Sequence, residues 1–182
     1  MQLNYLYIPI VYNKMMKKDV GNAILARGKI SHPEKLILPN KKWKNGRKRH
    51  VTIGQVIVGE MKVLVYSVHT ETSSVSRKKR LGQLEAIIEH AFKQSERYDY
   101  IVIGGDFNTL YKKDAQLYVQ LFRAAGFECA TDSIGNTAKA LFGLVKPTED
   151  FIFYKGLSKI KAGKIEVSKA SDHFPVYGVF AK

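Results

Sequence analysis

The most constraining feature of this sequence is the short run from Tyr100 to Gly105, in which four apolar residues precede two glycines. A strand with one face in water alternates apolar and polar residues. A continuous apolar run bounded by glycine is instead typical of a central strand buried on both faces. Asp106 and Asn108 follow directly. The sequence therefore predicts a central strand that delivers polar side chains to a loop at its end.

The apolar patterns on either side of this run predict a mixed α/β chain. Alternating or continuous apolar residues predict strands, and apolar residues at helical spacing predict helices. The expected elements, in chain order, are an antiparallel strand pair at 51–58 and 62–68, a helix near 76–95, the strand at 100–105, a helix near 113–125, and strands at 150–154 and 176–180. This order indicates a mixed-sheet sandwich with flanking helices.

The chain is expected to form one domain over residues 1–182. Its length and its 45% hydrophobic content suffice for a sizeable core. No internal repeat, low-complexity tract or linker divides it. There is no apolar run long enough to span a bilayer and no secretory leader, and the single cysteine, Cys129, has no internal disulfide partner. These features predict a soluble chain in a reducing cytoplasm.

The formal net charge of +14 indicates a polyanionic partner, either nucleic acid or an anionic phospholipid surface. Basic residues concentrate at Lys41–His50, around Trp43, and again at Arg77–Arg80, near the start of the expected first helix. Trp43 has a ring that can stack on a base. The alternative is a solvated basic surface without a specific partner.

Acidic, amide and imidazole side chains recur where the expected strands begin or end. These residues are His69, Asp106, Asn108, Asp150, Asp172 and His173. Rigid strands position such loop residues accurately, and active sites are often built this way. Each residue taken alone also fits a turn or an interior histidine. Their recurrence at strand ends favours a shared site.

Four of these segments, taken in order, resemble the successive motifs of the endonuclease/exonuclease/phosphatase superfamily, which has the deoxyribonuclease I-like fold. They are Val68–Glu71, Gly104–Thr109, Asp150–Phe153 and Ser171–Val176. Upstream, Gly21–Arg27 resembles the glycine-led strand of the same superfamily. The resemblance implies a four-layer α/β sandwich and a hydrolase that acts on phosphate esters.

The resemblance also implies the catalytic residues, which are His69, Asp106, Asn108, Asp150 and His173. His173 would activate or orient the attacking water, with Asp150 or Asp106 holding water and imidazole. His69 and Asn108 would donate to phosphate oxygens. Asp172 and Asp106 offer the hard oxygen ligands that suit Mg²⁺ or Mn²⁺. The sequence does not show which carboxylate pairs with which histidine.

The resemblance implies substrate-binding residues as well, namely Asn22 and Asn108, and the basic cluster adds Arg49. Glu71 is expected to point to solvent. Together with the charge, the motifs predict a metal-dependent nuclease. The alternatives are a phosphoesterase acting on a lipid or inositol phosphate, and a catalytically degenerate basic module that only binds nucleic acid.

The chain departs from the superfamily pattern at its N-terminus. The strand that ends in asparagine and the principal metal-binding glutamate have no match, so the fold is expected to be N-terminally shortened. Arg47–Arg49 stands where some nuclease members carry an acidic residue. Three hypotheses follow: a longer form is the enzyme, Asp172 and Asp106 hold the metal with a substrate phosphate, or the chain is non-catalytic. Missing strands would expose a sheet edge, which predicts a homo-oligomer.

Overall fold

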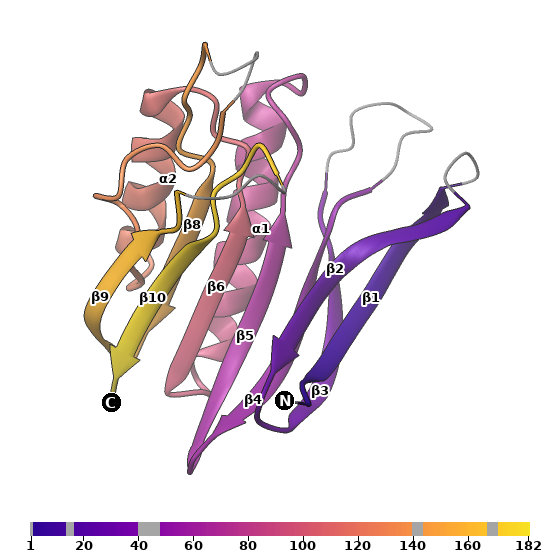
Figure 1. Ribbon diagram of the computed structural model, residues 1–182, viewed down its shortest axis with the longest axis vertical. Coiled ribbons are helices and arrows are strands. Elements are labelled where there is room, and N and C mark those ends of the chain that lie inside the picture. Colours follow the sequence, from indigo (N-terminus) through magenta and orange to yellow (C-terminus); the bar gives the residue numbers. More distant parts are fainter. Residues whose placement is uncertain (1, 14–16, 40–47, 140–143, 167–170) are drawn as a thin grey trace.

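The computed structural model describes residues 2–13, 17–39, 48–139, 144–166 and 171–182. A six-stranded mixed sheet lies at the centre, with two helices on one face and two separate two-stranded sheets on the other (Figure 1). The mixed α/β sandwich with flanking helices is therefore confirmed. The expected fourth layer has no counterpart in these described ranges, where both helices cover the same face.

The strands are β1 (Asn4–Asn13), β2 (Lys18–Ala26), β3 (Ile30–Ile37), β4 (His50–Val58), β5 (Met61–His69), β6 (Tyr100–Asp106), β7 (Glu128–Cys129), β8 (Asp150–Lys155), β9 (Ser158–Lys164) and β10 (Val176–Ala181). The helices are α1 (Arg77–Gln94) and α2 (Lys112–Ala124). Every element expected from the apolar patterns is present within two residues of its expected bounds. Strands β1, β3, β7 and β9 were not expected.

The central sheet has the strand order β3-β4-β5-β6-β8-β7. Strand β6 lies inside it as predicted, pairing in parallel with β5 and antiparallel with β8. The expected antiparallel pair is β4 and β5. Since β5 and β6 run in parallel and β8 runs the opposite way, the ends of β5 and β6 meet the start of β8 at one sheet edge.

The main core lies between the central sheet and the two helices. Phe107 is fully buried at its centre and packs edge-to-face on Phe122 and Phe153 at centroid distances of 5.8 and 5.4 Å. Burial of such rings contributes about 1.5–3 kcal/mol each. This core therefore anchors the start of the loop that follows β6, which carries the polar residues Asp106 and Asn108.

The second face of the central sheet carries two short sheets that lie apart from one another (Figure 1). Strand β2 packs against β4 and β5, and β10 packs against β8. Among the described residues, β2 pairs only with β1 and β10 pairs only with β9. Each pair therefore presents an edge of unpaired backbone groups.

The single cysteine lies in the core. Cys129 is a free, buried cysteine, and burial raises the pKa of its thiol to about 11, so it is an inert core residue. Within the described ranges, neither helix combines the length and the apolar character that crossing a bilayer requires.

Candidate active site

Three polar residues lie opposite one another on three neighbouring strands. His69 ends β5 and pairs in register with Asp106, which ends β6. Asp106 in turn pairs with Asp150, which begins β8. Backbone hydrogen bonds of the sheet therefore fix the spacing of the three side chains, and the predicted grouping at one sheet edge is what the register produces.

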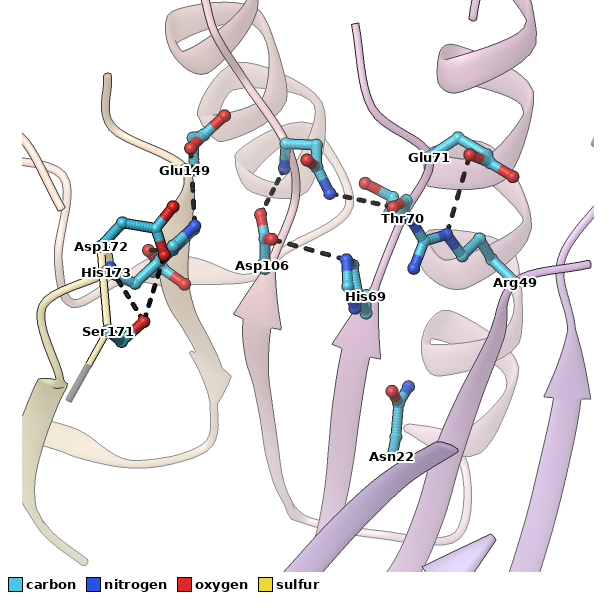
Figure 2. Close-up of polar contacts among 12 residues, drawn as sticks. Asn22, Arg49, His69, Thr70, Glu71, Asp106, Glu149, Ser171, Asp172 and His173 are labelled. Atoms are coloured by element: carbon cyan, nitrogen blue, oxygen red, sulfur yellow. Dashed lines mark hydrogen bonds and ion pairs between the residues drawn. The ribbon is translucent and has the colours of Figure 1, made fainter. Parts of the chain in front are cut away.

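The turn after β6 depends on two special backbone positions. Gly105 has φ +148°, and a Cβ there would lie 2.0 Å from the Val68 carbonyl oxygen, so only glycine fits. Asn108 has φ +50°, a left-handed conformation that asparagine tolerates. Its N–H donates to Asp106 Oδ1 at 2.8 Å, and its amide donates to the Thr70 carbonyl at 3.0 Å. These bonds hold Asp106 and Asn108 side by side, and Figure 2 shows Asp106 pointing toward His69.

His173 joins this edge from the segment that precedes β10. Its Nδ1 lies 2.8 Å from Asp150 Oδ2, and its backbone N–H donates to Ser171 Oγ at 3.0 Å. A carboxylate only accepts hydrogen bonds, so the ring donates from Nδ1. The partner of His173 is thus Asp150, which answers the question that the sequence left open. Asp172 is exposed beside it (Figure 2).

Glu149 is a site residue that the sequence did not predict. Its Oε2 lies 3.8 Å from His173 Nε2, so carboxylates flank both nitrogens of the imidazole. Glu149 directly precedes Asp150, the first residue of β8, and adjacent strand residues normally face opposite sides of a sheet. Here both side chains nevertheless approach the same imidazole ring.

Negative charge collects around His173 and shifts several pKa values. The hydrogen bond to Asp150 raises the pKa of His173 to about 9, against the effect of burial. Burial, with Asp150 adding to it, raises the pKa of Asp106 to about 6 although the Asn108 N–H opposes this. Burial and then the Asp106 carboxylate raise the pKa of Glu149 to about 7. The site is therefore one where an additional cation is favoured.

His69 behaves differently from His173. Burial, followed by the nearby Arg49 charge, lowers the pKa of His69 to about 4. The ring is therefore neutral at pH 7, and its 3.6 Å approach to Asp106 is a contact without a full ion pair. Neutral His69 has one N–H to donate and keeps this donor across the physiological range.

Arg49 lies at this same edge, and its guanidinium is paired with the carboxylate of Glu71. Its Nε is 3.7 Å from Glu71 Oε2, and the Glu71 backbone N–H donates to Gln83 of α1 at 2.9 Å. The expectation that Glu71 points to solvent is wrong, since the residue is 5% exposed. Its carboxylate is buried because the Arg49 guanidinium compensates its charge.

Asn22 lies on β2, away from the ends of the central strands (Figure 2). Its side-chain amide donates to the backbone carbonyls of His50 at 2.8 Å and Ser67 at 3.1 Å. Both amide hydrogens are thus used to join β2 to the central sheet. Only the carbonyl oxygen of the Asn22 side chain is left to meet a ligand.

The structure describes the second of the two basic clusters and only the end of the first. Most of the first, including Trp43, lies outside the described residues, which resume at Lys48. In the second, Arg77 and Arg80 both bind Asp114 of α2, at 2.8 and 2.5 Å. Arg80 is buried. These two arginines therefore join the helices, which weakens the interpretation of this cluster as a nucleic-acid surface.

Comparison with known proteins finds the same fold in longer chains. No protein-family model and no curated protein matches the sequence. Solved structures do match. An endonuclease/exonuclease/phosphatase family protein from Leptotrichia buccalis has a TM-score of 0.74 at 16% identity, over 100% of this chain and 72% of that one. A mannosyl-6-phosphatase from Bacteroides thetaiotaomicron has a TM-score of 0.73 at 19% identity, over 98% and 77%.

A third match is TDP2 from D. rerio, solved with a single-stranded DNA product, with a TM-score of 0.75 at 17% identity over 98% of this chain and 77% of that one. This chain therefore has the fold of endonuclease/exonuclease/phosphatase proteins, which confirms the resemblance found in the sequence at the level of the fold. At these identities the likeness carries no residue roles.

The contact between His173 and Asp150 predicts a measurable titration. In an NMR titration, His173 is expected to have a pKa near 9, and Asp150→Asn should lower it toward the ordinary 6.5 because the hydrogen bond to Asp150 is the main cause of the shift. Asp172→Asn is the matched control and should leave the value near 9. A native His173 that titrates near 6.5 would contradict the observed pairing.

The same shift has a consequence for stability. The pKa of His173 is higher in the folded chain than its ordinary value, so the protonated pair stabilises the fold in full below pH 6.5 and the gain is lost as pH rises through 9. The difference in free energy of unfolding between the native chain and Asp150→Asn should therefore shrink from pH 6.5 to pH 9 in urea titrations.

Proposed function

We propose that this chain is a metal-dependent phosphodiesterase that hydrolyses nucleic acid. The observation that carries the proposal is the alignment of His69, Asp106 and Asp150 on three paired strands, with His173 bonded to Asp150 at 2.8 Å. Hydrolysis of a phosphodiester requires a positioned water, donors for the phosphoryl oxygens and help for the leaving alkoxide. One sheet edge offers groups for the first two requirements.

The roles follow from the protonation states. His173, fixed by Asp150, orients the attacking water through Nε2 and accepts its proton more readily as pH approaches 9. Asp106 is ionised at pH 7 and holds the same water. Neutral His69 and the Asn108 amide donate to phosphoryl oxygens, and the Arg49 guanidinium adds a positive charge beside them. Water attacks phosphorus as the P–O bond to the leaving alkoxide breaks, the alkoxide takes up a proton from solvent, and no covalent intermediate on the enzyme forms.

The oxygen donors fit Mg²⁺ or Mn²⁺ as a partly protein-bound ion. The raised pKa values of Asp106 and Glu149 reflect crowded, buried carboxylates, which a cation would relieve. No group of three or more side-chain ligands suited to a metal occurs among the described residues. We therefore assign the ion to Asp172 and Asp106, with water and substrate oxygens completing its shell, as is usual for Mg²⁺. When bound, it neutralises charge on the phosphoryl group.

Removal of His173 tests the enzymatic proposal. His173→Ala should lower the rate of DNA cleavage in Mg²⁺ or Mn²⁺ by about 10²- to 10⁴-fold, since the water loses its orienting group. A chelator should abolish cleavage by the native chain. His32→Ala, at an exposed histidine on β3, is the control and should cleave normally. Equal rates in the two variants, or no cleavage by the folded native chain, would contradict the proposal.

Nucleic acid is the preferred substrate class because the net charge is +14 and because TDP2, which shares the fold, was solved with a DNA product. A phosphate on a sugar, lipid or inositol headgroup is the second candidate, favoured by the match to a mannosyl-6-phosphatase. A non-catalytic basic module is the third. The last is disfavoured by the paired His173 and Asp150, which binding alone does not require.

Salt dependence separates these substrates. Binding to DNA through three phosphate contacts should weaken by roughly 20- to 40-fold between about 50 mM and about 200 mM salt. A small phosphate ester, with one such contact, should show a much shallower loss. Fluorescence anisotropy of His173→Ala with labelled DNA measures binding without turnover. A flat profile for DNA would favour the small phosphate esters.

We also propose that residues 1–182 act as one domain and that the open edges of β2 and β10 pair with a second copy. Light scattering at micromolar concentration should give a mass above the 20.6 kDa of one chain. Val179→Lys places a charge on exposed β10 and should lower the measured mass to that of a single chain. A monomeric native chain would overturn the association.

A further inference from the structure

Thr137 is a fully buried residue that contacts two parts of the candidate active site at once. It lies in the segment between β7 and β8, and its Oγ1 accepts hydrogen bonds from the backbone N–H groups of Glu149 and Asp150, each at 2.9 Å. A hydroxyl oxygen has two lone pairs, so one side chain satisfies both donors. Thr137 therefore fixes the backbone of the two carboxylate residues that flank His173.

The backbone of the same segment holds the other partner. The Thr137 carbonyl accepts from the N–H of Phe174 at 2.7 Å, and Ala138 forms an isolated bridge with His173. Lys139 N–H donates to the Asp172 carbonyl at 2.8 Å. The segment thus runs beside the turn that carries His173 and controls where this turn lies.

Asp150 and His173 stand 23 residues apart in the chain and meet through a single 2.8 Å hydrogen bond. Neither is tied to the other by a shared strand ladder, because β8 and β10 belong to different sheets. Thr137 is hydrogen-bonded to both sides and therefore links the start of β8 to the His173 turn.

We propose that Thr137 is a positioning residue for the pair formed by Asp150 and His173. Its hydroxyl sets Glu149 and Asp150, its carbonyl sets the His173 turn, and the imidazole is thereby held with its two nitrogens between the two carboxylates. The inference rests on the proposed phosphodiesterase function for its kinetic test. It does not need that function for its structural test.

Loss of the hydroxyl should act on the imidazole more than on substrate binding. Without Oγ1, two partly buried N–H groups lose their acceptor, and the start of β8 must move to find another. A displacement of about 1 Å in a catalytic group costs about 100-fold in rate. The phosphate donor Asn108 is held by the carbonyl of Thr70, which follows β5, and is not bonded to Thr137, so substrate affinity should change little.

The experiment compares Thr137→Val, Thr137→Ser and Thr131→Val in the full chain. Valine keeps the shape of threonine without the hydroxyl, and serine keeps the hydroxyl. Thr131 is the matched control, since it is also fully buried and its Oγ1 accepts from Ile152 N–H at 3.0 Å, two residues further along β8. Thr137→Ala is the second variant, should valine prevent folding.

Thr137→Val is expected to lower kcat about 10- to 100-fold with KM nearly unchanged, whereas Thr137→Ser and Thr131→Val should stay near the native kcat. NMR follows the downfield Nδ1–H resonance of His173, which should shift or vanish in Thr137→Val only. Equal effects of the variants at Thr137 and Thr131 on both readouts would overturn the inference.

The two readouts separate this inference from the proposed function. If the native chain cleaves no phosphodiester, the proposed function fails, and the His173 resonance alone decides the role of Thr137. If the chain is active and the resonance and kcat survive in Thr137→Val and Thr137→Ala, the positioning role fails while the enzymatic proposal stands.

Discussion

The backbone pairing of β6 with β5 on one side and β8 on the other is the constraint on which the rest of the structure depends. It is set by a buried apolar strand, and the register then places His69, Asp106 and Asp150 in one row. Gly105 lets β6 approach the backbone of β5 at Val68, which a side chain would prevent. The chemistry of the site is therefore a consequence of how the core strands pair.

The two histidines near this row lie in different electrostatic environments. His173 lies among carboxylates and holds its proton, while His69 lies near Arg49 and stays neutral. Two identical side chains thus acquire different properties from their neighbours. Burial is the main cause of the lowered pKa of His69, and Arg49, itself held by the buried Glu71, adds to it.

The sequence predicted the elements whose apolar pattern is strong and missed those whose pattern is interrupted. Pro9 stands within β1 at a register shift, and β3 carries Pro33 and a left-handed His32 beside another shift. Strand β9 is rich in exposed lysine and has no apolar face. Proline and bulges remove the alternation by which strands are recognised, so only the three-dimensional pairing reveals these elements.

The residues of the candidate site could be predicted where they lie next to a strand with a strong apolar pattern. His69, Asp106, Asn108, Asp150 and His173 could be predicted because they follow or precede strong strands. Glu149 was not predicted, because its contact with His173 joins residues that are distant in the sequence. Thr137 could not be either, because its role comes from hydrogen bonds to residues distant in sequence. The partner of each histidine likewise depended on side-chain geometry.

The most direct test of this account is a crystal structure of the chain with Mn²⁺ and a short DNA product. The terminal phosphate should lie at the strand ends, within hydrogen-bonding distance of His69, Asn108 and His173. Mn²⁺ should lie beside Asp106 and Asp172. A phosphate bound elsewhere on the basic surface, with these side chains unchanged, would contradict it.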